Sequence, residues 1–414
     1  MLEDTLKTLE TDQRWQANPL VVHLRLFATS LIEKDYSSST IELKLWLLAN
    51  FGKWLGQSGL SDASIDEQLV KRFINARQTE GRLHRGNVAT LRQFLDHLRK
   101  REVLPPQERP IHEQSPLEEI LNRYEKHLRS ERGLATPTII NYQPVIRKFL
   151  IERFGDAPFL FRELTPPDIS RFVLRHFQNI SPKRAQLMTT AFRSFFRFLF
   201  GHGELQIDLA ASVPTVAGWR LSTVPKYLIP EEVHRVLRAC DRQTPIGRRN
   251  YAILLLLARL GLRAGEVVGL KLNDIDWRAG ELIVRGKGLF HDRMPLPSDV
   301  GDALACYLRR DRPRCQTRQV FICVRAPRRG FSNASAVTSV VRRALDQADL
   351  HPAFKGAHLL RHSLATSMLR SGATMTEIGE VLRHRTPNTT ETYAKVDFDG
   401  LRSLAHEWPI GGGL

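Results

Sequence analysis

Two stretches in the first half of the chain resemble each other, and this repeat constrains the fold more than any other feature of the sequence. STIELKLWLLANFGKWL, from Ser39, pairs with PTIINYQPVIRKFLIER, from Pro137, and the offset stays within 98–101 residues further along. The last paired apolar residues recur at i, i+3, i+4 and i+7, the period of an amphipathic helix. They are Leu91, Phe94, Leu95 and Leu98 in one copy and Phe192, Phe195, Phe196 and Leu199 in the other. Two copies of one small helical unit are the simplest interpretation.

Proline-rich segments fall where such units would end. Pro105–Pro110 contains three prolines, and 210–225 combines Pro214 and Pro225 with Ser, Thr and Gly. Because proline fixes φ and stops helices, both segments are interpreted as linkers. The predicted domains are therefore 1–109, 110–215 and 222–414.

The third predicted domain changes character. Helices are expected from Pro230, over 251–259, and over about 334–349, 357–370, 375–383 and 388–395. Short strands are expected around 275–277, 282–284 and 294–296, the last two joined as a hairpin across Gly286–Gly288. The fold class is thus mainly α: two small all-α domains, then a mostly helical α+β domain with a small antiparallel sheet.

Positive charge concentrates in the third domain. The chain of 414 residues has a net charge of +17, and +11 of it lies in 222–414. Arginine dominates, with 47 Arg against 14 Lys, and its planar guanidinium suits bidentate contacts with phosphate. This distribution favours nucleic acid as the partner, with solubility or an arginine-rich proteome as the alternative.

Other classes are disfavoured. The longest apolar run, Tyr251–Ala258, is far shorter than the about 20 residues that span a membrane. The acidic start MLEDTLKTLE lacks the pattern of a signal peptide. The four cysteines form no C-x-x-C pair, so we expect neither a zinc site nor a disulfide framework. We expect a cytoplasmic protein.

Five motifs of the third domain follow one another in a characteristic order. They are Gly261–Glu266 with Leu270 and Asp274–Asp276, Gly286-Lys287-Gly288, His358–Ser363, Leu382-Arg383-His384, and Thr392-Tyr393. The region resembles the tyrosine recombinase (phage integrase) family, including its spacings: 24 residues from Arg263 to Lys287, 23 from Arg361 to His384, and 9 from His384 to Tyr393. Each motif alone is weak, but the ordered set is specific.

The resemblance implies a role for each motif residue in phosphodiester exchange. Arg263 and Arg361 would clamp the non-bridging phosphate oxygens, because the transition state concentrates negative charge there. Tyr393 would be the nucleophile that forms a 3′-phosphotyrosyl bond. His358 would be the general base, Lys287 the general acid toward the leaving 5′-oxygen, and His384 a hydrogen-bond donor to phosphate. The phosphotyrosyl bond would retain the energy of the broken phosphodiester, so no ATP is expected. Arg and Lys would supply the positive charge that stabilises the transition state, so no metal is expected either.

Other family positions suggest supporting roles. Glu266 and Asp274 would brace the active-site helix and strand, while His362 and Ser363 would pack or touch the backbone. The chain departs from the family at Arg383, where the family commonly has glycine. Arg383 would either contact phosphate or face solvent.

The flanking domains are interpreted from the same resemblance. The domain 110–215 is similar to the family's core-binding domain, with Lys183, Arg184, Arg193 and Arg197 as candidate phosphate contacts or a solvated face. The domain 1–109 looks like a second such unit, which would extend the DNA footprint or join protomers. A tail helix over 396–406 would dock in cis or in trans.

The resulting prediction is a site-specific DNA strand-exchange enzyme. It would act as a homotetramer on double-stranded DNA with specific recombination sites, alone or with other recombinases or accessory proteins, in the bacterial nucleoid. The extra first domain favours integration, excision or transposition of a mobile element. The alternatives are a Xer-like chromosome or plasmid dimer resolvase, a catalytically silent architectural DNA-binding protein, and a type IB topoisomerase.

Overall fold

The computed structural model describes most of the chain. The described residues are 18–60, 65–81, 84, 86–105, 115–155, 157–178, 180–217, 224–286 and 291–396. By backbone contacts, 105–222 forms one compact unit, and 1–104 with 223–414 forms the other. Three regions are described in turn: the N-terminal bundle (18–105), the middle bundle (115–217) and the C-terminal region (224–396). Among the described helices, none is long and apolar enough to cross a membrane.

The N-terminal bundle contains four helices. They are α3 (Val21–Glu33), α4 (Ser38–Gln57), α5 (Glu67–Thr79) and α6 (Asn87–Lys100). Phe27 and Phe94 meet edge to face in its core, and Phe51 packs on Phe73. Asp66 begins α5 by accepting a hydrogen bond from the Leu69 amide at 2.6 Å.

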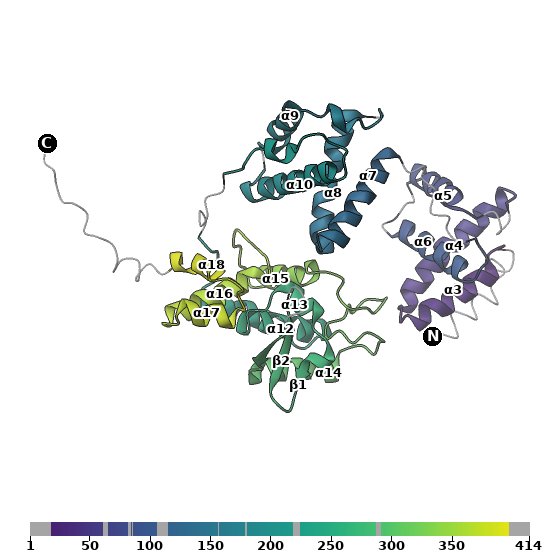
Figure 1. The fold of residues 1–414 in the computed structure, drawn as a ribbon. Coiled ribbons are helices and arrows are strands. Elements are labelled where there is room, and N and C mark those ends of the chain that lie inside the picture. The colour runs from purple at the N-terminus through teal and green to yellow at the C-terminus, as the bar shows by residue number, and fades with distance from the viewer. Residues whose placement is uncertain are drawn as a thin grey trace, which may run out of the picture. The chain divides into compact units, whose positions relative to one another are not determined.

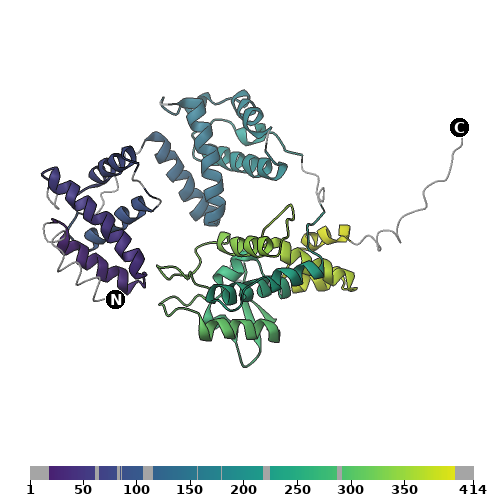
Figure 2. The same cartoon turned by 180° about the vertical axis from the view of Figure 1, so that it is seen from behind.

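The middle bundle repeats this order, and Figures 1 and 2 show it from opposite sides. Its main helices are α7 (Pro116–Lys126), α8 (Thr136–Phe154), α9 (Pro166–Phe177) and α10 (Pro182–Gly201). A π-helical turn (His127–Glu131) extends α7, and 3₁₀ turns lie at Phe161–Glu163 and Leu209–Ser212. The paired positions of the sequence repeat are buried in both bundles: Leu91, Phe94, Leu95 and Leu98 in one, and Phe192, Phe195, Phe196 and Leu199 in the other. The paired positions of the sequence repeat thus share a pattern of burial.

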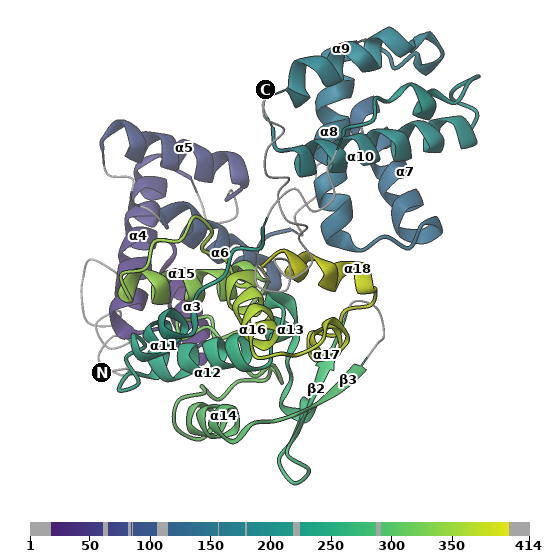
Figure 3. The ribbon, with the colours of Figure 1, turned by 90° about the vertical axis from the view of Figure 1, so that its left-hand side faces the viewer.

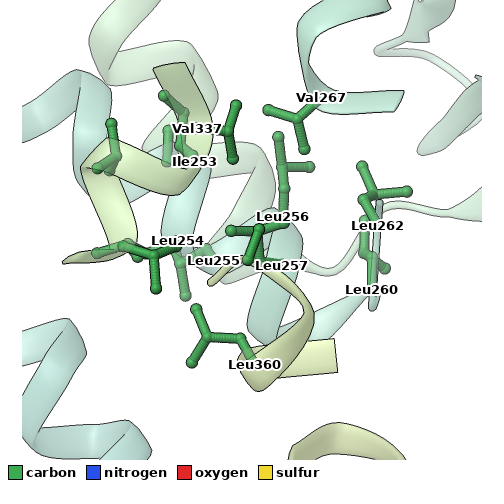
Figure 4. Packing of buried hydrophobic residues seen from close by; sticks show 14 of the residues in the cluster. Ile253, Leu254, Leu255, Leu256, Leu257, Leu260, Leu262, Val267, Val337 and Leu360 are labelled. Atoms are coloured by element: carbon green, nitrogen blue, oxygen red, sulfur yellow. The ribbon is translucent and has the colours of Figure 1, made fainter. Parts of the chain in front are cut away.

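The C-terminal region is built around one apolar helix. Its helices are α11 (Pro230–Arg238), α12 (Pro245–Arg259), α13 (Ala264–Gly269), α14 (Ser298–Arg310), α15 (Ser335–Gln347), α16 (His358–Arg370), α17 (Met375–Val381) and α18 (Pro387–Thr390), with 3₁₀ turns at Leu272–Asp274 and Glu391–Val396. α12 packs against α14, α15 and α16. Its run Ile253–Leu257 is fully buried, and Val267, Val337 and Leu360 from other helices converge on it (Figure 4). Burial on all sides explains why this segment is apolar all round.

A small antiparallel sheet lies beside these helices in the order β1 (Ile275–Asp276), β2 (Glu281–Arg285), β3 (His291–Pro295). Leu282 pairs with Ile275 on one side and Met294 on the other, and all three are buried. The fold is mainly helical with this one sheet, as predicted.

Some boundaries differ from the sequence prediction. α12 begins at Pro245 rather than near 251, and β3 covers His291–Pro295 rather than 294–296. The sequence prediction missed α14, and the expected helix over 388–395 divides into α18 and a 3₁₀ turn. The expected tail helix over 396–406 falls, beyond Val396, outside the described residues.

Candidate active site

The sharp turn after α12 leads directly into the first site residue, Arg263. Gly261 has φ of +58°, and a Cβ there would lie 2.6 Å from Cδ2 of Leu382. Only glycine combines the left-handed backbone with so close an approach. Because the turn reverses the chain, Arg263 becomes the residue that begins α13.

Arg361 ties this turn to a second segment. It lies on α16, is 3% exposed, and donates hydrogen bonds to the carbonyl oxygens of Gly261 and Leu382. Burial, aided by the charges of Arg263 and Arg383, lowers the pKa of Arg361 to about 10, so it is still a cation at neutral pH. A guanidinium has five N–H donors, so two carbonyl contacts leave capacity for an anion.

Arg263 is held by the carboxylate of Glu266. Oε2 of Glu266 accepts from the Arg263 amide at 2.8 Å, and Oε1 accepts from the Arg263 guanidinium at 2.8 Å. Burial alone would raise the pKa of Glu266, but the Arg263 amide and the charges of Arg383 and Arg263 hold it below its usual value. The Arg263 side chain is 39% exposed and can therefore meet a ligand. The prediction that Glu266 braces the helix agrees with these contacts.

Asp274 has a similar supporting position. Its carboxylate accepts from the Lys271 amide at 2.9 Å and pairs with Arg285 of β2 at 2.5 Å. This pair joins the 3₁₀ turn before β1 to the strand that leads toward Lys287. Lys287 itself lies outside the described residues.

Tyr393 is deeply buried on the last 3₁₀ turn, only 1% exposed. Its ring stacks on His384, with centroids 6.3 Å apart and planes within 3°. Burial raises the pKa of Tyr393 to about 12, against the opposing charges of Arg361 and Arg263. The phenol is therefore protonated at neutral pH and needs a base to act as a nucleophile.

His362, rather than His358, contacts the Tyr393 hydroxyl. Nδ1 of His362 lies 2.8 Å from that oxygen, whereas the His358 ring is exposed and 6.2 Å from the His362 ring, centroid to centroid. Burial, then the charges of His358 and Arg361, lower the pKa of His362 to about 4. His362 packs on the Tyr393 ring as expected, with centroids 5.5 Å apart, but the sequence analysis did not predict its hydrogen bond with the hydroxyl. Its spacing of four from His358, which places both on one face of α16, was the available signal.

His384 lies on the other side of Tyr393. Its Nδ1 is 2.7 Å from Oγ1 of Thr390, which fixes the ring. Burial, with the charges of Arg361, Arg263 and Arg383, lowers the pKa of His384 to about 4. The imidazole is thus neutral at pH 7 and can donate one hydrogen bond. Ser363 touches backbone as expected, accepting from the Leu228 amide at 2.8 Å.

Figure 3 shows α16, α17 and α18 near one another; α16 contacts α17 and the last 3₁₀ turn, which carries Tyr393, and α17 contacts α18. Five of the six predicted catalytic residues are described. Among them, His384 stacks on Tyr393, and the charge of Arg361 affects the pKa of both. Arg383 turns its side chain to Glu266 rather than to solvent, with Nη2 2.9 Å from Oε2. Three guanidinium groups around one carboxylate leave an excess of positive charge, the requirement of a phosphate site.

The candidate DNA contacts of the middle bundle divide into two kinds. Lys183, Arg184 and Arg197 are exposed on α10. Arg193 is half-buried and donates to the carbonyl oxygens of Val213 and Pro214 at 3.0 and 3.1 Å. It anchors the chain that follows the bundle.

One group among the described residues could hold a metal ion. Ligand atoms of His127, Glu131 and His202 lie within 4.8 Å of one another in the middle bundle. His127 is 2.7 Å from Glu131, and Nδ1 of His202 is 2.8 Å from the Phe198 carbonyl. This group belongs to a different unit from the residues around Tyr393.

Comparison with known proteins identifies related chains. Residues 226–399 match the phage integrase family. The chain is 43% identical over 393 residues to the integrase/recombinase y4rA of Sinorhizobium fredii, covering 94% of this chain and 95% of that protein. It is 32% identical over 304 residues to the tyrosine recombinase XerD of Mycobacterium tuberculosis, covering 69% of this chain and 95% of that protein.

A solved structure shares the fold. A lambda integrase tetramer bound to a Holliday junction has a TM-score of 0.52 and 18% sequence identity, covering 77% of this chain and 88% of that chain.

Proposed function

The chain belongs to the phage integrase family of tyrosine recombinases and is a DNA recombinase, and from this premise we propose that Tyr393 cuts one DNA strand by forming a 3′-phosphotyrosyl bond. The single observation that carries the assignment is the grouping of buried Tyr393 with His362, His384 and the cation Arg361. A surface tyrosine or a packing tyrosine has no need of these partners.

In the cleavage step, the phenolic oxygen of Tyr393 attacks the phosphorus and the bond to the 5′-oxygen breaks. Arg263 and Arg361 bind the non-bridging oxygens and stabilise the charge that develops there. The leaving 5′-oxygen takes a proton from Lys287, and His384 donates a hydrogen bond to phosphate. In the second step a 5′-hydroxyl of the other duplex attacks the phosphotyrosine, and Tyr393 leaves with its proton restored. The energy of the phosphodiester bond is retained in the phosphotyrosine, so no ATP is used. Arg263, Arg361 and Lys287 supply the positive charge, so no metal is used.

The Tyr393 proton has two candidate acceptors, both on α16. His362 is in contact with the hydroxyl in the DNA-free chain, and its neutral imidazole at pH 7 can accept the proton. His358 is the acceptor that the family resemblance implies, and it is one helical turn away. The geometry favours His362 as the first acceptor, with His358 completing the phosphate pocket when DNA binds.

The biological role is the movement of a mobile element. The Sinorhizobium fredii relative matches nearly the whole of this chain and of its own length, whereas XerD matches 95% of its own length but only 69% of this chain. This chain thus contains a region that a resolvase of the length of XerD does not match. The additional region supports integration, excision or transposition. A Xer-like dimer resolvase is the second candidate.

The assembly on DNA is a homotetramer that holds two duplexes. The shared fold with lambda integrase, whose solved structure is a tetramer on a Holliday junction, supports this stoichiometry. The middle bundle binds the duplex as a core-binding domain, with Lys183, Arg184 and Arg197 at phosphates and Arg193 in an anchoring position. The N-terminal bundle extends the footprint or joins protomers. The enzyme works in the bacterial cytoplasm, on the nucleoid, with accessory proteins as further partners.

Covalent trapping tests the proposal. Wild-type protein and Tyr393→Phe are incubated with nicked duplexes from the ends of the encoding element, and the products are separated on denaturing gels. A protease-sensitive, retarded DNA band with wild type alone is the expected result. Tight DNA binding by both proteins without a band from either would favour an architectural DNA-binding protein.

A further inference from the structure

Arg383 occupies an unusual backbone position between two site residues. It follows Leu382, whose carbonyl binds Arg361, and precedes His384. Its φ is +55°, in the left-handed region that favours glycine. Its side chain is nonetheless long, charged and only 7% exposed. A residue that keeps such a conformation must be held in place by the contacts of its side chain.

These contacts join Arg383 to three segments of the chain: 260–266, β3 and the end of the preceding helix α17. The guanidinium donates to Glu266 of α13 at 2.9 Å, to the Val381 carbonyl at 3.1 Å and to the Leu260 carbonyl at 3.5 Å. It also contacts the sulfur of Met294 on β3. Each segment leads directly to a proposed catalytic residue: α13 and Leu260 to Arg263, β3 to the hairpin of Lys287, and Val381 to His384.

The contacts with Arg263 form a closed ring. Glu266 accepts from Arg383 with Oε2 and from the Arg263 guanidinium with Oε1. The Arg263 guanidinium in turn donates to the backbone carbonyl of Arg383 at 3.4 Å. The carboxylate cannot turn away from Arg263 without breaking its bond to Arg383.

Neither role expected from the sequence fits this arrangement. A side chain 7% exposed does not face solvent. A phosphate-binding arginine would present its donors outward, whereas the Nη donors of Arg383 are directed at protein acceptors. Arg383 is thus in a position to act through Arg263 and not on the DNA.

We propose that Arg383 is a positioning residue for strand cleavage: through Glu266 it holds Arg263 in the geometry that receives the phosphate, and it fastens the β2–β3 hairpin and the His384 turn to the same point. This inference rests on the proposed function.

A double-mutant cycle tests the proposal in the full-length protein. The variants are Arg383→Met, Glu266→Gln and the double variant, with a nicked duplex from the encoding element as the probe. We expect each single variant to lower the single-turnover cleavage rate constant about 10- to 100-fold, because misplacement of a catalytic group by about 1 Å has effects of this size. The double variant should be no slower than the worse single variant, because both changes break one ring.

DNA binding separates positioning from direct contact. The dissociation constant, and its dependence on salt, should be unchanged in Arg383→Met. A fall of about one unit in the slope of log K against log salt would identify a phosphate contact and overturn the proposal. Multiplicative rate losses in the double variant would overturn it as well.

The matched control is Arg248→Met. Arg248 forms a partly buried ion pair with Asp311 in the same region, with nitrogen–oxygen distances of 2.5 and 2.6 Å, and it also donates to the carbonyl oxygens of Arg242 and Gln243. Its loss removes the same kind of interaction, so it should lower stability and leave the cleavage rate constant of folded protein unchanged. Equal rate losses in Arg248→Met and Arg383→Met would reduce Arg383 to a general structural role.

Hydrogen exchange of the DNA-free protein gives a readout independent of activity. In Arg383→Met the amides of 261–269, where the Arg263 amide donates to Glu266, should exchange faster than in wild type and in Arg248→Met. Unchanged exchange would overturn the inference even if no substrate were cleaved, whereas absence of wild-type cleavage alone would count against the proposed function. If Arg383→Met does not fold, Arg383→Lys is measured instead, with Arg248→Lys as its control.

Discussion

Tyr393 is enclosed by residues that would take part in its reaction. Its side chain is 1% exposed, its hydroxyl lies beside His362, and burial raises its pKa to about 12. The opposing effect of Arg361 and Arg263 on that pKa shows that their charges reach the phenol. An added phosphate would share these cations, so deprotonation depends on the neighbouring histidine.

The two histidines of α16 can be separated by substitution. We expect His362→Gln to lower the single-turnover cleavage rate constant by about 100-fold or more, the usual contribution of a general base. His358→Gln should have the smaller effect on cleavage and the larger effect on affinity for phosphate. The measurement is single-turnover cleavage of a nicked duplex with each variant, beside DNA binding. A larger cleavage defect in His358→Gln would assign the base to His358 instead.

Arg383 illustrates the strain that a side-chain network can hold. A non-glycine residue in the left-handed region costs about 1–2 kcal/mol, and Arg383 has φ of +55°. Its ion pair with Glu266 is shielded, since the two side chains are 7% and 6% exposed. The ring with Arg263 therefore offsets the strain with contacts that also order the site.

At the scale of elements, α10 shows that arginines four positions apart can have different tasks. Arg197 is exposed, while Arg193 is committed to the carbonyls of Val213 and Pro214. Helix α10 thus carries both a candidate DNA contact and the anchor of the following segment.

This difference gives a paired prediction. Arg197→Ala should reduce the slope of log K for DNA binding against log salt by about one unit, because one phosphate contact is lost. Arg193→Ala should leave that slope unchanged and lower the free energy of unfolding of the middle bundle, because three acceptors lose their donor. Salt titrations and denaturant unfolding measure the two effects. If the slope changed with Arg193→Ala and not with Arg197→Ala, the assignment would be reversed.

At the scale of the whole molecule, acid should weaken the C-terminal region first. The pKa values of His362 and His384 are lowered to about 4 by burial, below the 6.5 of an unfolded histidine. Folding therefore favours their neutral forms. The stability they contribute is complete above pH 6.5 and falls as the pH drops toward 4, because the unfolded chain binds the protons first.

Calorimetry between pH 7.5 and 4.5 checks this expectation. The thermal transition of the C-terminal region should move to lower temperature below pH 6.5. In His362→Gln the shift should be smaller. The pKa of Glu266 is lowered, so the stability that Glu266 contributes is lost only at still lower pH. The change in stability between pH 6.5 and 4.5 is therefore assigned to the two histidines. A transition temperature independent of pH from 6.5 to 5 would contradict the assignment.

Much of the fold followed from local pattern. The repeat spacing predicted two helical bundles, and the apolar run of Ile253–Leu257 predicted a buried helix. The motif Gly286-Lys287-Gly288 predicted the antiparallel pairing of β2 with β3. Helix α14 was missed although its buried Val300, Ala303, Leu304 and Tyr307 recur at i, i+3, i+4 and i+7, the helical period. The ends of β3 and α12 differed by a few residues, since pairing and packing decide where an element stops.

The order and spacing of the motifs predict recombinase chemistry, because they place Arg263, Arg361, His384 and Tyr393 at fixed intervals on predictable elements. Which side chains are in contact follows only from the tertiary fold. It placed His362 on the Tyr393 hydroxyl, turned Arg383 inward to Glu266, and committed Arg193 to backbone carbonyls. The physical reason is range: periodicity and turn chemistry act over a few residues, whereas these contacts join positions 20 to 120 apart and depend on packing of the whole core.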